Sequence, residues 1–377
     1  MAKKGDIVVI GGGALGMLSA RALADSGREV TLIERGRLGR GTSRAGGGIM
    51  SPLAPWEAPP AVAALAGASL PLLPEITAAL ARDTGIDSEY RVTGVLYLDS
   101  EDPETVLDHA RRHGLRAERL DAARLAGVEP AAARGQTDAV LLPDIGQLRN
   151  PRFLDALAAD LRRRGVRILE EAGEAGLALG DNGVRVEAGV HGTLHADDVV
   201  VAAGAWSARL LAPLGLQLPV HPVRGQMLWY LLPRPLLQHI LLRRGRYVIP
   251  RREGVVLVGS TVEEAGFDES VTTAAAEELK AAATEMMPLL GALPVQGQWS
   301  GLRPRAPDGI PLIGRVPGVR NLWVNTGHFR NGINLAPGSA ALLASLLGGN
   351  RPVVDPSPYD PATRMAQAGP GEYNARH

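Results

Sequence analysis

The sequence predicts an α/β protein: a discontinuous, Rossmann-like nucleotide-binding domain with an inserted, mostly antiparallel β domain. Three observations predict this fold. A short apolar run at residues 6–10 leads through a glycine motif into a helical pattern. Buried-strand patterns return at residues 198–202 and 322–324, far along the chain. Strand-rich sequence at residues 218–262 lies between them, as expected if a second domain interrupts the first.

The expected elements follow the chain in order. The first domain is expected to hold strands at 6–10, 29–33, 166–169, 198–202 and 322–324, with helices at 14–25, 151–164 and 335–347. The remaining patterns predict strands at 90–98, 223–231, 247–250 and 255–258, helices at 103–113 and 271–287, and a hairpin of 184–187 with 193–195. Helical patches at 59–82 are broken by Pro71 and Pro74.

A length of 377 residues suits two domains. The patterns place the nucleotide-binding domain at residues 1–80, 140–216 and 300–360, and the inserted substrate domain at 81–139 and 217–299. Residues from 355 onward are rich in Pro, Gly and polar groups, so we expect a loosely ordered tail, assigned in the domain division to 361–377.

The composition excludes several classes of function. Lys plus Arg equals Asp plus Glu at 40 each, so no net field favours nucleic acid or an anionic membrane. There are no cysteines, which excludes disulfides and thiolate nucleophiles, and the eight histidines show no metal-ligand spacing. The first apolar run is too short for a signal peptide, and no uncharged stretch approaches bilayer length. We therefore expect a cytoplasmic protein that binds no metal, nucleic acid or membrane.

A glycine motif occupies the turn between the first strand and the first helix. Gly11 permits a tight turn, Gly13 allows a pyrophosphate to approach the backbone, and Gly16 allows the helix to pack closely on the strand. Glu34, at the end of the second strand, is placed to accept hydrogen bonds from a ribose diol. These elements in this order predict a dinucleotide site, although the motif does not distinguish NAD from FAD.

Two further segments could contact a dinucleotide. The polar, glycine-dense stretch at 41–48 can supply hydroxyls and backbone N–H groups to a pyrophosphate and a flavin edge, unless it is only a flexible surface loop. The segment at 199–206 is a strand running into a turn of small residues. Its backbone could approach an adenosine, or it could be an ordinary buried strand end.

Two arginines far along the chain indicate a site for an acid. Arg303 lies in Gly301-Leu302-Arg303-Pro304, and Arg330 lies in GHFRNGI at 327–333. Both stand beside glycines, which let the backbone come close to a ligand. A guanidinium matches a carboxylate with two parallel, charge-assisted hydrogen bonds. The alternative for Arg303 is a structural salt bridge.

Together these segments resemble a known family. The opening GGGALG with Glu34, the GTSRAGGGI loop, the VVVAAGAWS strand, RGQM, GRYVIPRR and the GLRP and GHFRNGI pair resemble the FAD-dependent D-amino-acid-oxidase superfamily. Within it they are most similar to bacterial glycine oxidases of the thiamine pathway, over roughly residues 6 to 360. The resemblance implies FAD as cofactor, a small amino-acid or amine carboxylate as substrate, molecular oxygen as partner, and a homotetramer.

The resemblance also implies residue roles. Arg303 and Tyr247 would contact the substrate carboxylate, with Arg330 nearby; from the sequence alone, Tyr247 could equally be a core residue. Cofactor contacts are implied for Gly11, Gly13, Ala14, Leu15, Gly16, Glu34, Arg35, Thr42, Ser43, Ala45, Gly46, Gly47, Gly48, Glu174, Ala203, Gly204, Trp206, Arg303, His328, Arg330, Asn331, Gly332 and Ile333. The segment at 330–333 precedes the last helix, whose dipole can stabilise negative charge on a reduced flavin. His328 is interpreted as a positioned loop residue, because the implied chemistry needs no side-chain base.

The implied reaction is oxidative deamination of glycine or small N-substituted glycines such as sarcosine and iminodiacetate. A hydride leaves the α-carbon for the flavin, the imino acid hydrolyses to a 2-oxo acid such as glyoxylate, and electrons pass to oxygen, giving hydrogen peroxide. Arg305 stands where the family often has a small residue. It suggests a subsite for a second anionic group, with solvent or a structural acid as the alternative partner.

Three other readings stay open at this point. A D-amino acid dehydrogenase of the same fold would pass electrons to an acceptor other than oxygen, and it would release no peroxide in air. An NAD-dependent dehydrogenase would not be yellow. A non-catalytic flavin-binding protein would keep its flavin oxidised with every small amino acid offered anaerobically.

Overall fold

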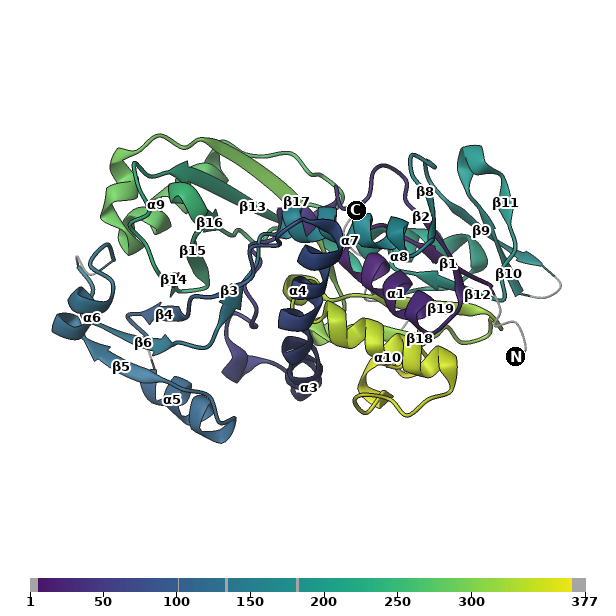
Figure 1. Cartoon of the computed structure of the whole chain (residues 1–377), viewed down its shortest axis with the longest axis horizontal. Helices are drawn as coiled ribbons and strands as arrows, with labels where there is room; N and C mark the ends of the chain where they lie inside the picture. Colours follow the sequence, from purple (N-terminus) through teal and green to yellow (C-terminus); the bar gives the residue numbers. More distant parts are fainter. Residues whose placement is uncertain (1–5, 101, 133–134, 181–182, 368–377) are drawn as a thin grey trace.

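The computed structural model describes residues 6–100, 102–132, 135–180 and 183–367. Its two large sheets lie side by side, with helices packed on and between them (Figure 1). The chain crosses between the sheets several times, so each sheet is built from segments that are far apart in the sequence. This arrangement confirms the predicted α/β fold, in which parallel and antiparallel sheets are separate.

The first sheet has six strands in the order β18-β19-β12-β1-β2-β8. β18 (Leu312–Arg315) pairs antiparallel with its neighbour at one edge. The parallel strands were all expected from their apolar runs, which are typical of strands covered on both faces. They are β1 (Asp6–Ile10), β2 (Glu29–Ile33), β8 (Arg167–Leu169), β12 (Asp198–Val201) and β19 (Leu322–Thr326).

Different layers cover the two faces of this sheet. Side chains alternate along each strand, so neighbouring residues contact different layers. Ile7 and Val9 face three helices, α1 (Ala14–Asp25), α7 (Asn150–Arg163) and α10 (Ala336–Gly348). Val8 and Ile10 face a small antiparallel sheet of β9 (Gly176–Gly180), β10 (Gly183–Glu187) and β11 (Thr193–Leu194). The expected hairpin is therefore extended by a third strand, β9.

The second sheet has eight strands in the order β17-β13-β16-β15-β14-β4-β6-β5. All pairs are antiparallel except β14 with β4. The helix α9 (Thr273–Met286) covers one face through Leu279, Ala283 and Met286. The strands are β4 (Val95–Leu98), β5 (Glu118–Asp121), β6 (Asp138–Leu142), β13 (His221–Leu231), β14 (Ile240–Arg243), β15 (Arg246–Pro250), β16 (Val255–Gly259) and β17 (Gly297–Arg305).

The smaller helices of this half lie near its far edge (Figure 1). They are α5 (Pro103–Arg112) and α6 (Ala122–Val128). The strands β5, β6 and β14 had no counterpart among the expected elements. β5 is the polar sequence ERLD with one buried residue, and β6 and β14 show no alternation of apolar and polar residues, so none has the pattern of a half-buried strand.

Two expectations about local structure were wrong. The single strand expected at 90–98 is two strands, β3 (Arg91–Val92) and β4, because Gly94 adopts φ +70° and turns the chain. The chain from residue 355 is also not loose as far as it is described. It forms α11 (Pro361–Gln367), and before it Tyr359 is fully buried and donates to the Ala61 carbonyl at 2.6 Å. Residues 368–377 of the expected tail lie outside the described residues.

The segment Pro60–Thr84 has the length and hydropathy of a membrane span, contrary to the expectation that no stretch approaches that length. In the structure it is two helices, α3 (Pro60–Ser69) and α4 (Leu73–Thr84), joined by a short 3₁₀ turn. Leu65, Leu73 and Leu80 are fully buried, and they pack in the same core as α7 and α10. One face of the segment thus packs in this core, while 39% of its most apolar window is buried in all.

The domain division given above stays a prediction. Two of its expected boundaries, near residues 140 and 300, fall inside β6 and β17. Both strands belong to the eight-stranded sheet, and β17 reaches the junction between the two sheets. The junction is where the candidate site lies.

Candidate functional site

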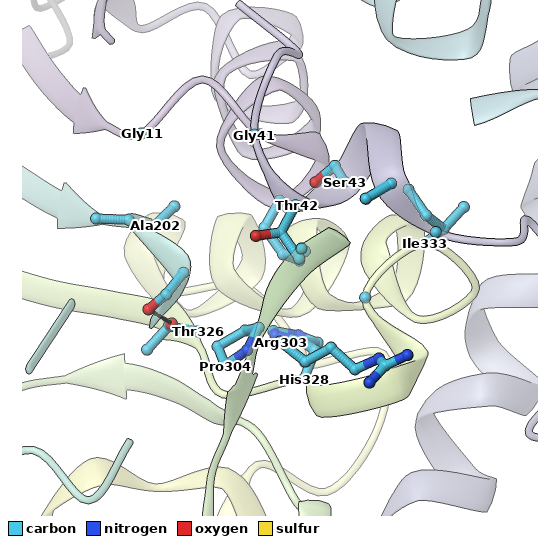
Figure 2. A pocket seen from close by; sticks show the side chains of 18 of the residues that line it. Gly11, Gly41, Thr42, Ser43, Ala202, Arg303, Pro304, Thr326, His328 and Ile333 are labelled. Carbon is cyan, nitrogen blue, oxygen red and sulfur yellow. Dashed lines mark hydrogen bonds between the residues drawn. The ribbon is translucent and has the colours of Figure 1, made fainter. Parts of the chain in front are cut away.

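A cavity of about 370 Å³ lies where the two sheets meet. One end is lined by the turns that follow β1, β2 and β12, which are carboxyl ends of parallel strands. The other end is lined by residues of β13, β15 and β17 and by the turn after β19. Figure 2 shows Arg303 and Pro304 on one side of this cavity, facing Thr42 and Ser43 of the helix α2 (Thr42–Ala45). Such a position outside the carboxyl ends of the strands is typical of ligand sites in open α/β sheets.

The glycine motif forms a turn that has no room for side chains. Gly11 adopts φ +113°, and an ideal Cβ there would lie 2.4 Å from the Ala202 carbonyl oxygen. A Cβ on Gly16 would lie 1.7 Å from the Gly11 carbonyl oxygen, so α1 packs directly on the turn. Gly16 and Ala14 therefore shape the turn and do not line the cavity, whereas Leu15 does line it.

The amino end of α1 and the end of β2 are linked to the neighbouring backbone. The Ala14 N–H donates to Ser43 Oγ at 3.0 Å. The two carboxylate oxygens of Glu34 accept from Gly12 N at 2.7 Å and from Gly36 N at 3.0 Å. These bonds hold the Glu34 carboxylate at the cavity wall, as the ribose-binding hypothesis requires.

A stack of charged and aromatic side chains stands at this end of the cavity. The Arg35 guanidinium lies 3.8 Å from the centre of the Trp206 ring, which in turn lies 5.7 Å from the Phe267 ring. Arg209 covers Phe267 at 3.5 Å. The two rings are tilted by 50°, and a guanidinium lies over each of them in a cation–π contact. Glu174, Ala203 and Gly204 line the same end, as expected, whereas Arg209 and Phe267 were not predicted as part of the site.

The guanidinium of Arg303 lies against the backbone of the neighbouring strand. Gly225 of β13 stands two positions along from the partner of Arg303, and an ideal Cβ on it would be 2.0 Å from Arg303 Nη2. Only glycine leaves this space. Arg303 donates to the Thr261 carbonyl at 3.0 Å, to Ser260 Oγ at 2.7 Å and to the Arg224 carbonyl at 3.4 Å.

Arg303 therefore carries a positive charge with no hydrogen-bonded carboxylate among the described residues. Burial lowers the pKa of Arg303, since desolvation disfavours the charged form. A structural salt bridge, the alternative considered from the sequence, is thus not what the contacts show.

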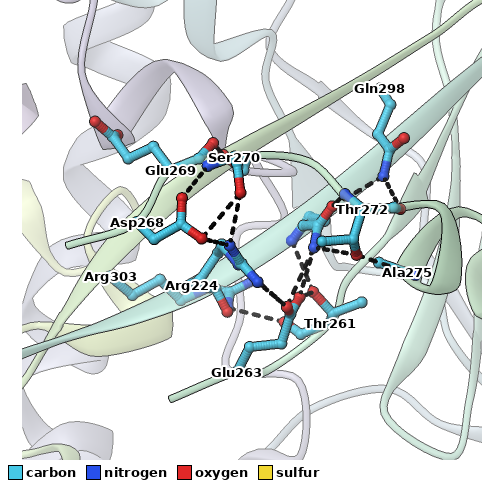
Figure 3. A network of polar contacts seen from close by, with 12 residues as sticks. Arg224, Thr261, Glu263, Asp268, Glu269, Ser270, Thr272, Ala275, Gln298 and Arg303 are labelled. Atoms are coloured by element: carbon cyan, nitrogen blue, oxygen red, sulfur yellow. Dashed lines mark hydrogen bonds and ion pairs between the residues drawn. The ribbon is translucent and has the colours of Figure 1, made fainter. Parts of the chain in front are cut away.

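The carbonyls that receive Arg303 belong to a polar network around Glu263 (Figure 3). Glu263 accepts from Arg224 Nη2 at 2.7 Å and from Gln226 Nε2 at 3.0 Å, and it also accepts from the Thr261 hydroxyl. Arg224 donates in addition to Asp268 at 2.6 Å. These contacts hold the side chains of Arg224 and Thr261, and the Arg224 carbonyl also accepts from the Glu263 N–H at 3.0 Å.

Tyr247 and Arg330 line the cavity together with Arg303. Tyr247 is buried, and its hydroxyl contacts Met227 Sδ at 3.8 Å and is also hydrogen-bonded to the Arg303 side chain. Arg330 donates only to the Gly245 carbonyl, at 3.4 Å, within the described contacts. Burial lowers the pKa of Arg330, and the nearby charge of Arg303 lowers that pKa further. Two like charges close together favour binding of an anion between them.

His328 is a buried residue that holds the turn against α10. Its Nε2 lies 2.8 Å from Ser339 Oγ, and that hydroxyl donates to the Leu335 carbonyl at 2.9 Å. Nε2 must therefore be the donor. Burial lowers the pKa of His328 to about 3, so the imidazole is neutral at physiological pH. This agrees with the interpretation of a positioned loop residue.

Some of the remaining expected residues line the cavity, and others do not. Gly332 and Ile333 line the cavity, whereas Asn331 does not. Arg305 does not line it either, and its guanidinium pairs with Glu264 at 3.3 Å on the surface. The contacts thus favour the alternative that Arg305 meets a structural acid, and they do not support a second anion subsite at this residue.

Sequence reasoning missed several residues at the site, because their roles depend on contacts between distant segments. Asn150, Ser260, Gly225 and Met227 line the cavity. Arg251 lies behind the glycine-rich loop, where its Nη2 donates to the Gly47 carbonyl. A possible signal was RGQM and GRYVIPRR, which contain three of these residues, but the motifs alone assign no contact to them.

Comparison with known proteins supports the resemblance seen in the sequence. The family model described as FAD dependent oxidoreductase matches residues 6–346. The glycine oxidase of Pseudomonas aeruginosa is 45% identical over 361 residues, which is 95% of this chain and 99% of that protein.

Two solved structures share the whole fold. The glycine oxidase from Geobacillus kaustophilus superposes with a TM-score of 0.87 and 29% identity, covering 94% of this chain and 98% of that one. The iminodiacetate oxidase from Chelativorans sp. BNC1 superposes with a TM-score of 0.85 and 26% identity, again covering 94% and 98%. The chain therefore belongs to the DAO family of FAD-dependent oxidoreductases.

Proposed function

We propose that this protein is an FAD-dependent oxidase of glycine or small N-substituted glycines such as sarcosine and iminodiacetate. The observation that carries the proposal is Arg303. Its guanidinium lines the cavity, its hydrogen-bond partners among the described residues are carbonyls and hydroxyls, and a second cation, Arg330, lies nearby. A substrate carboxylate would supply the missing negative charge. The relatives named glycine oxidase and iminodiacetate oxidase act on acids of this size.

The residues present fit FAD. At one end, the side-chain-free turn at Gly11 and Gly13 suits a pyrophosphate, and the carboxylate of Glu34 suits a ribose. At the other end, Gly46, Gly47 and Gly48 line the cavity with backbone alone, next to Tyr247. When bound, FAD would supply the two-electron redox chemistry, and the protein would supply binding and orientation.

The side chains around the substrate end would then bind and orient the acid. Arg303 would hold the carboxylate with two N–H groups, and the Tyr247 hydroxyl would donate to the same group. Ile49, Leu53 and Met227 make that end largely apolar, which excludes water from the reacting carbon. The buried and neutral His328 is engaged with Ser339, so the amine must enter already deprotonated. The expected products are a 2-oxo acid, ammonia or an amine, and hydrogen peroxide.

The test is a peroxide-coupled assay of Arg303→Ala with glycine, sarcosine and iminodiacetate. We expect the KM to rise by roughly a hundredfold or more, because the variant removes one partner of a desolvated charge pair. Arg305→Ala is the matched control, since this arginine is two residues away on the same strand and pairs with Glu264 outside the cavity. A near-normal KM in Arg303→Ala would contradict the proposal.

The same assay separates the alternative function. A D-amino acid dehydrogenase would reduce an artificial acceptor with these substrates but would release no peroxide in air. Arg305→Ala should also leave the ratio of iminodiacetate to glycine activity unchanged, as its surface position implies. A homotetrameric assembly and a role in thiamine biosynthesis remain predictions from the family resemblance, and a cytoplasmic location remains a prediction from the sequence pattern.

A further inference from the structure

Three side chains hold the glycine-rich loop by alternate carbonyl groups. Asn150 Nδ2 donates to the Ser43 carbonyl at 2.8 Å, and Trp299 Nε1 donates to the Ala45 carbonyl at 3.0 Å. Arg251 Nη2 donates to the Gly47 carbonyl. The donors come from α7, from β17 and from the residue after β15, so the loop is gripped from three separate elements.

These three hydrogen bonds determine the direction of the N–H groups between the bonded carbonyls. A peptide bond is planar and trans, so the N–H of one residue points opposite to the carbonyl of the residue before it. The Ala45 and Gly47 carbonyls point at the gripping side chains, hence the N–H groups of Gly46 and Gly48 point the other way. Both glycines line the cavity, and the structure records no acceptor for the Gly48 N–H among the described residues.

The glycines are also needed for the hydrogen bonds that hold the loop. An ideal Cβ on Gly48 would lie 2.3 Å from Asn150 Oδ1 and 3.3 Å from Arg251 Nη2. A Cβ on Gly46 would lie 2.9 Å from Asn150 Nδ2. Side chains at these positions would push the donors away from the carbonyls that they hold. The three glycines at 46–48 therefore let the donor side chains come close behind the loop, and they also let a ligand come close on the cavity side.

Arg251 differs from the other two donors because it is charged and buried. Besides Gly47, it donates to Gln147 Oε1 at 2.7 Å, and Gln147 is in turn fixed by a 2.9 Å bond to Thr93. No carboxylate is hydrogen-bonded to it among the described residues. Burial lowers the pKa of Arg251 to about 9, with a further decrease from the charge of Arg91. A desolvated cation interacts strongly with the peptide dipole beside it, because the local dielectric constant is low.

We propose that Arg251 is a positioning residue that acts through the Gly47–Gly48 peptide on an electron-rich edge of the bound cofactor. Its charge polarises this peptide, which makes the Gly48 N–H a stronger donor on the cavity side. Tyr247 identifies this part of the loop as the substrate end, since a Cβ on Gly47 would lie 3.3 Å from its hydroxyl. The inference rests on the proposed function, in which the cavity holds a flavin.

The experiment compares three variants by two equilibrium measurements. Arg251→Lys keeps the charge, whereas Arg251→Gln removes it but keeps an amide that can donate to Gly47. Arg252→Gln is the matched control, because Arg252 is exposed and pairs with Asp87 at 2.9 Å on the surface. The dissociation constant of FAD is measured by titrating the apoprotein, and the two-electron midpoint potential of the flavin is measured on each holoenzyme.

We expect Arg251→Gln to bind FAD roughly tenfold more weakly, and to lower the equilibrium constant for flavin reduction roughly tenfold, which is about 30 mV. Arg251→Lys should lie between Arg251→Gln and the wild type, and Arg252→Gln should match the wild type. Equal potentials in Arg251→Lys and Arg251→Gln would overturn the inference, since a structural role needs only the hydrogen bond. If the wild-type protein binds no FAD, the proposed function itself fails.

Discussion

At the scale of single residues, the arginines around the cavity differ in what neutralises them. Arg224 is paired with two acids, Glu263 and Asp268, and Arg305 is paired with one. Arg303 and Arg330 have only carbonyl and hydroxyl partners in the part of the chain that the structure describes. A desolvated cation without an acid is costly, so these two arginines are the residues that gain most from an anionic ligand.

His328 gives a prediction about stability and pH. The unfolded chain binds a proton at this imidazole below the ordinary value of 6.5, whereas the folded protein binds it only near a pKa of about 3. The unfolded state therefore holds more protons in this window, and the stability due to His328 declines as the pH falls from 6.5 towards 3. We expect FAD-saturated wild type to lose about 1 kcal/mol more than His328→Gln between pH 7 and 5.5.

Urea unfolding of both proteins at the two pH values measures this difference. His195→Gln serves as the control, because His195 is exposed and its substitution should leave the pH dependence unchanged. An identical pH dependence in wild type and His328→Gln would show that His328 is not buried in its neutral form.

At the scale of elements, the pairing of β13 with β17 builds the proposed carboxylate site. Val223 pairs with Arg303 and Gly225 pairs with Gly301, so the arginine leans over a glycine of the neighbouring strand. The sequence predicted the importance of Arg303 from its charge and its glycine neighbours. It could not predict Gly225 or Ser260, because their part in the site comes from strand register, which side-chain types alone do not determine.

Glu263 is the element-scale prediction, because it joins β13 to the segment that follows β16. We expect Glu263→Gln to raise the KM for glycine roughly tenfold with a smaller change in kcat. The reason is that the Arg224 guanidinium and the Thr261 hydroxyl would lose their charge-assisted contacts, which hold in place the two residues whose carbonyls receive Arg303. The measurement is the peroxide-coupled assay over a range of glycine concentrations.

Glu264→Gln is a close control for this variant. Glu264 is the next residue and is also an acid, but it is exposed and pairs with Arg305 away from the cavity. Its substitution should change neither constant. If both variants raised the KM equally, the effect would come from the net charge of this surface and not from the network in Figure 3.

At the scale of the whole molecule, the two sheets share one cavity. The parallel sheet was predicted almost completely, since its strands are apolar runs next to recognisable helices. The order of the eight-stranded sheet was not predicted, because β4 lies beside β14, about 145 residues later in the sequence. Local patterns carry no information on such pairing.

This shared cavity predicts that FAD stabilises both halves together. At a hundred times its dissociation constant, FAD should add about 2.7 kcal/mol to the free energy of unfolding and raise the Tm of a single transition. At the same free concentration, AMP should bind more weakly and so stabilise the protein less, because it cannot reach Tyr247 and Arg330. Differential scanning calorimetry of the apoprotein with each ligand tests this. Two separate transitions, with only one moved by FAD, would contradict the shared site.

The spread of the cavity lining along the chain also limits when the cofactor can bind during synthesis. A growing chain that has completed β1, α1 and β2 already holds the glycine motif and Glu34. It still lacks Trp299, which grips the loop, and both Arg303 and Arg330. Complete binding of FAD must therefore wait until residues as late as Asn334 have left the ribosome. A chain that stops earlier would contain the glycine motif but would lack the residues that complete the FAD cavity.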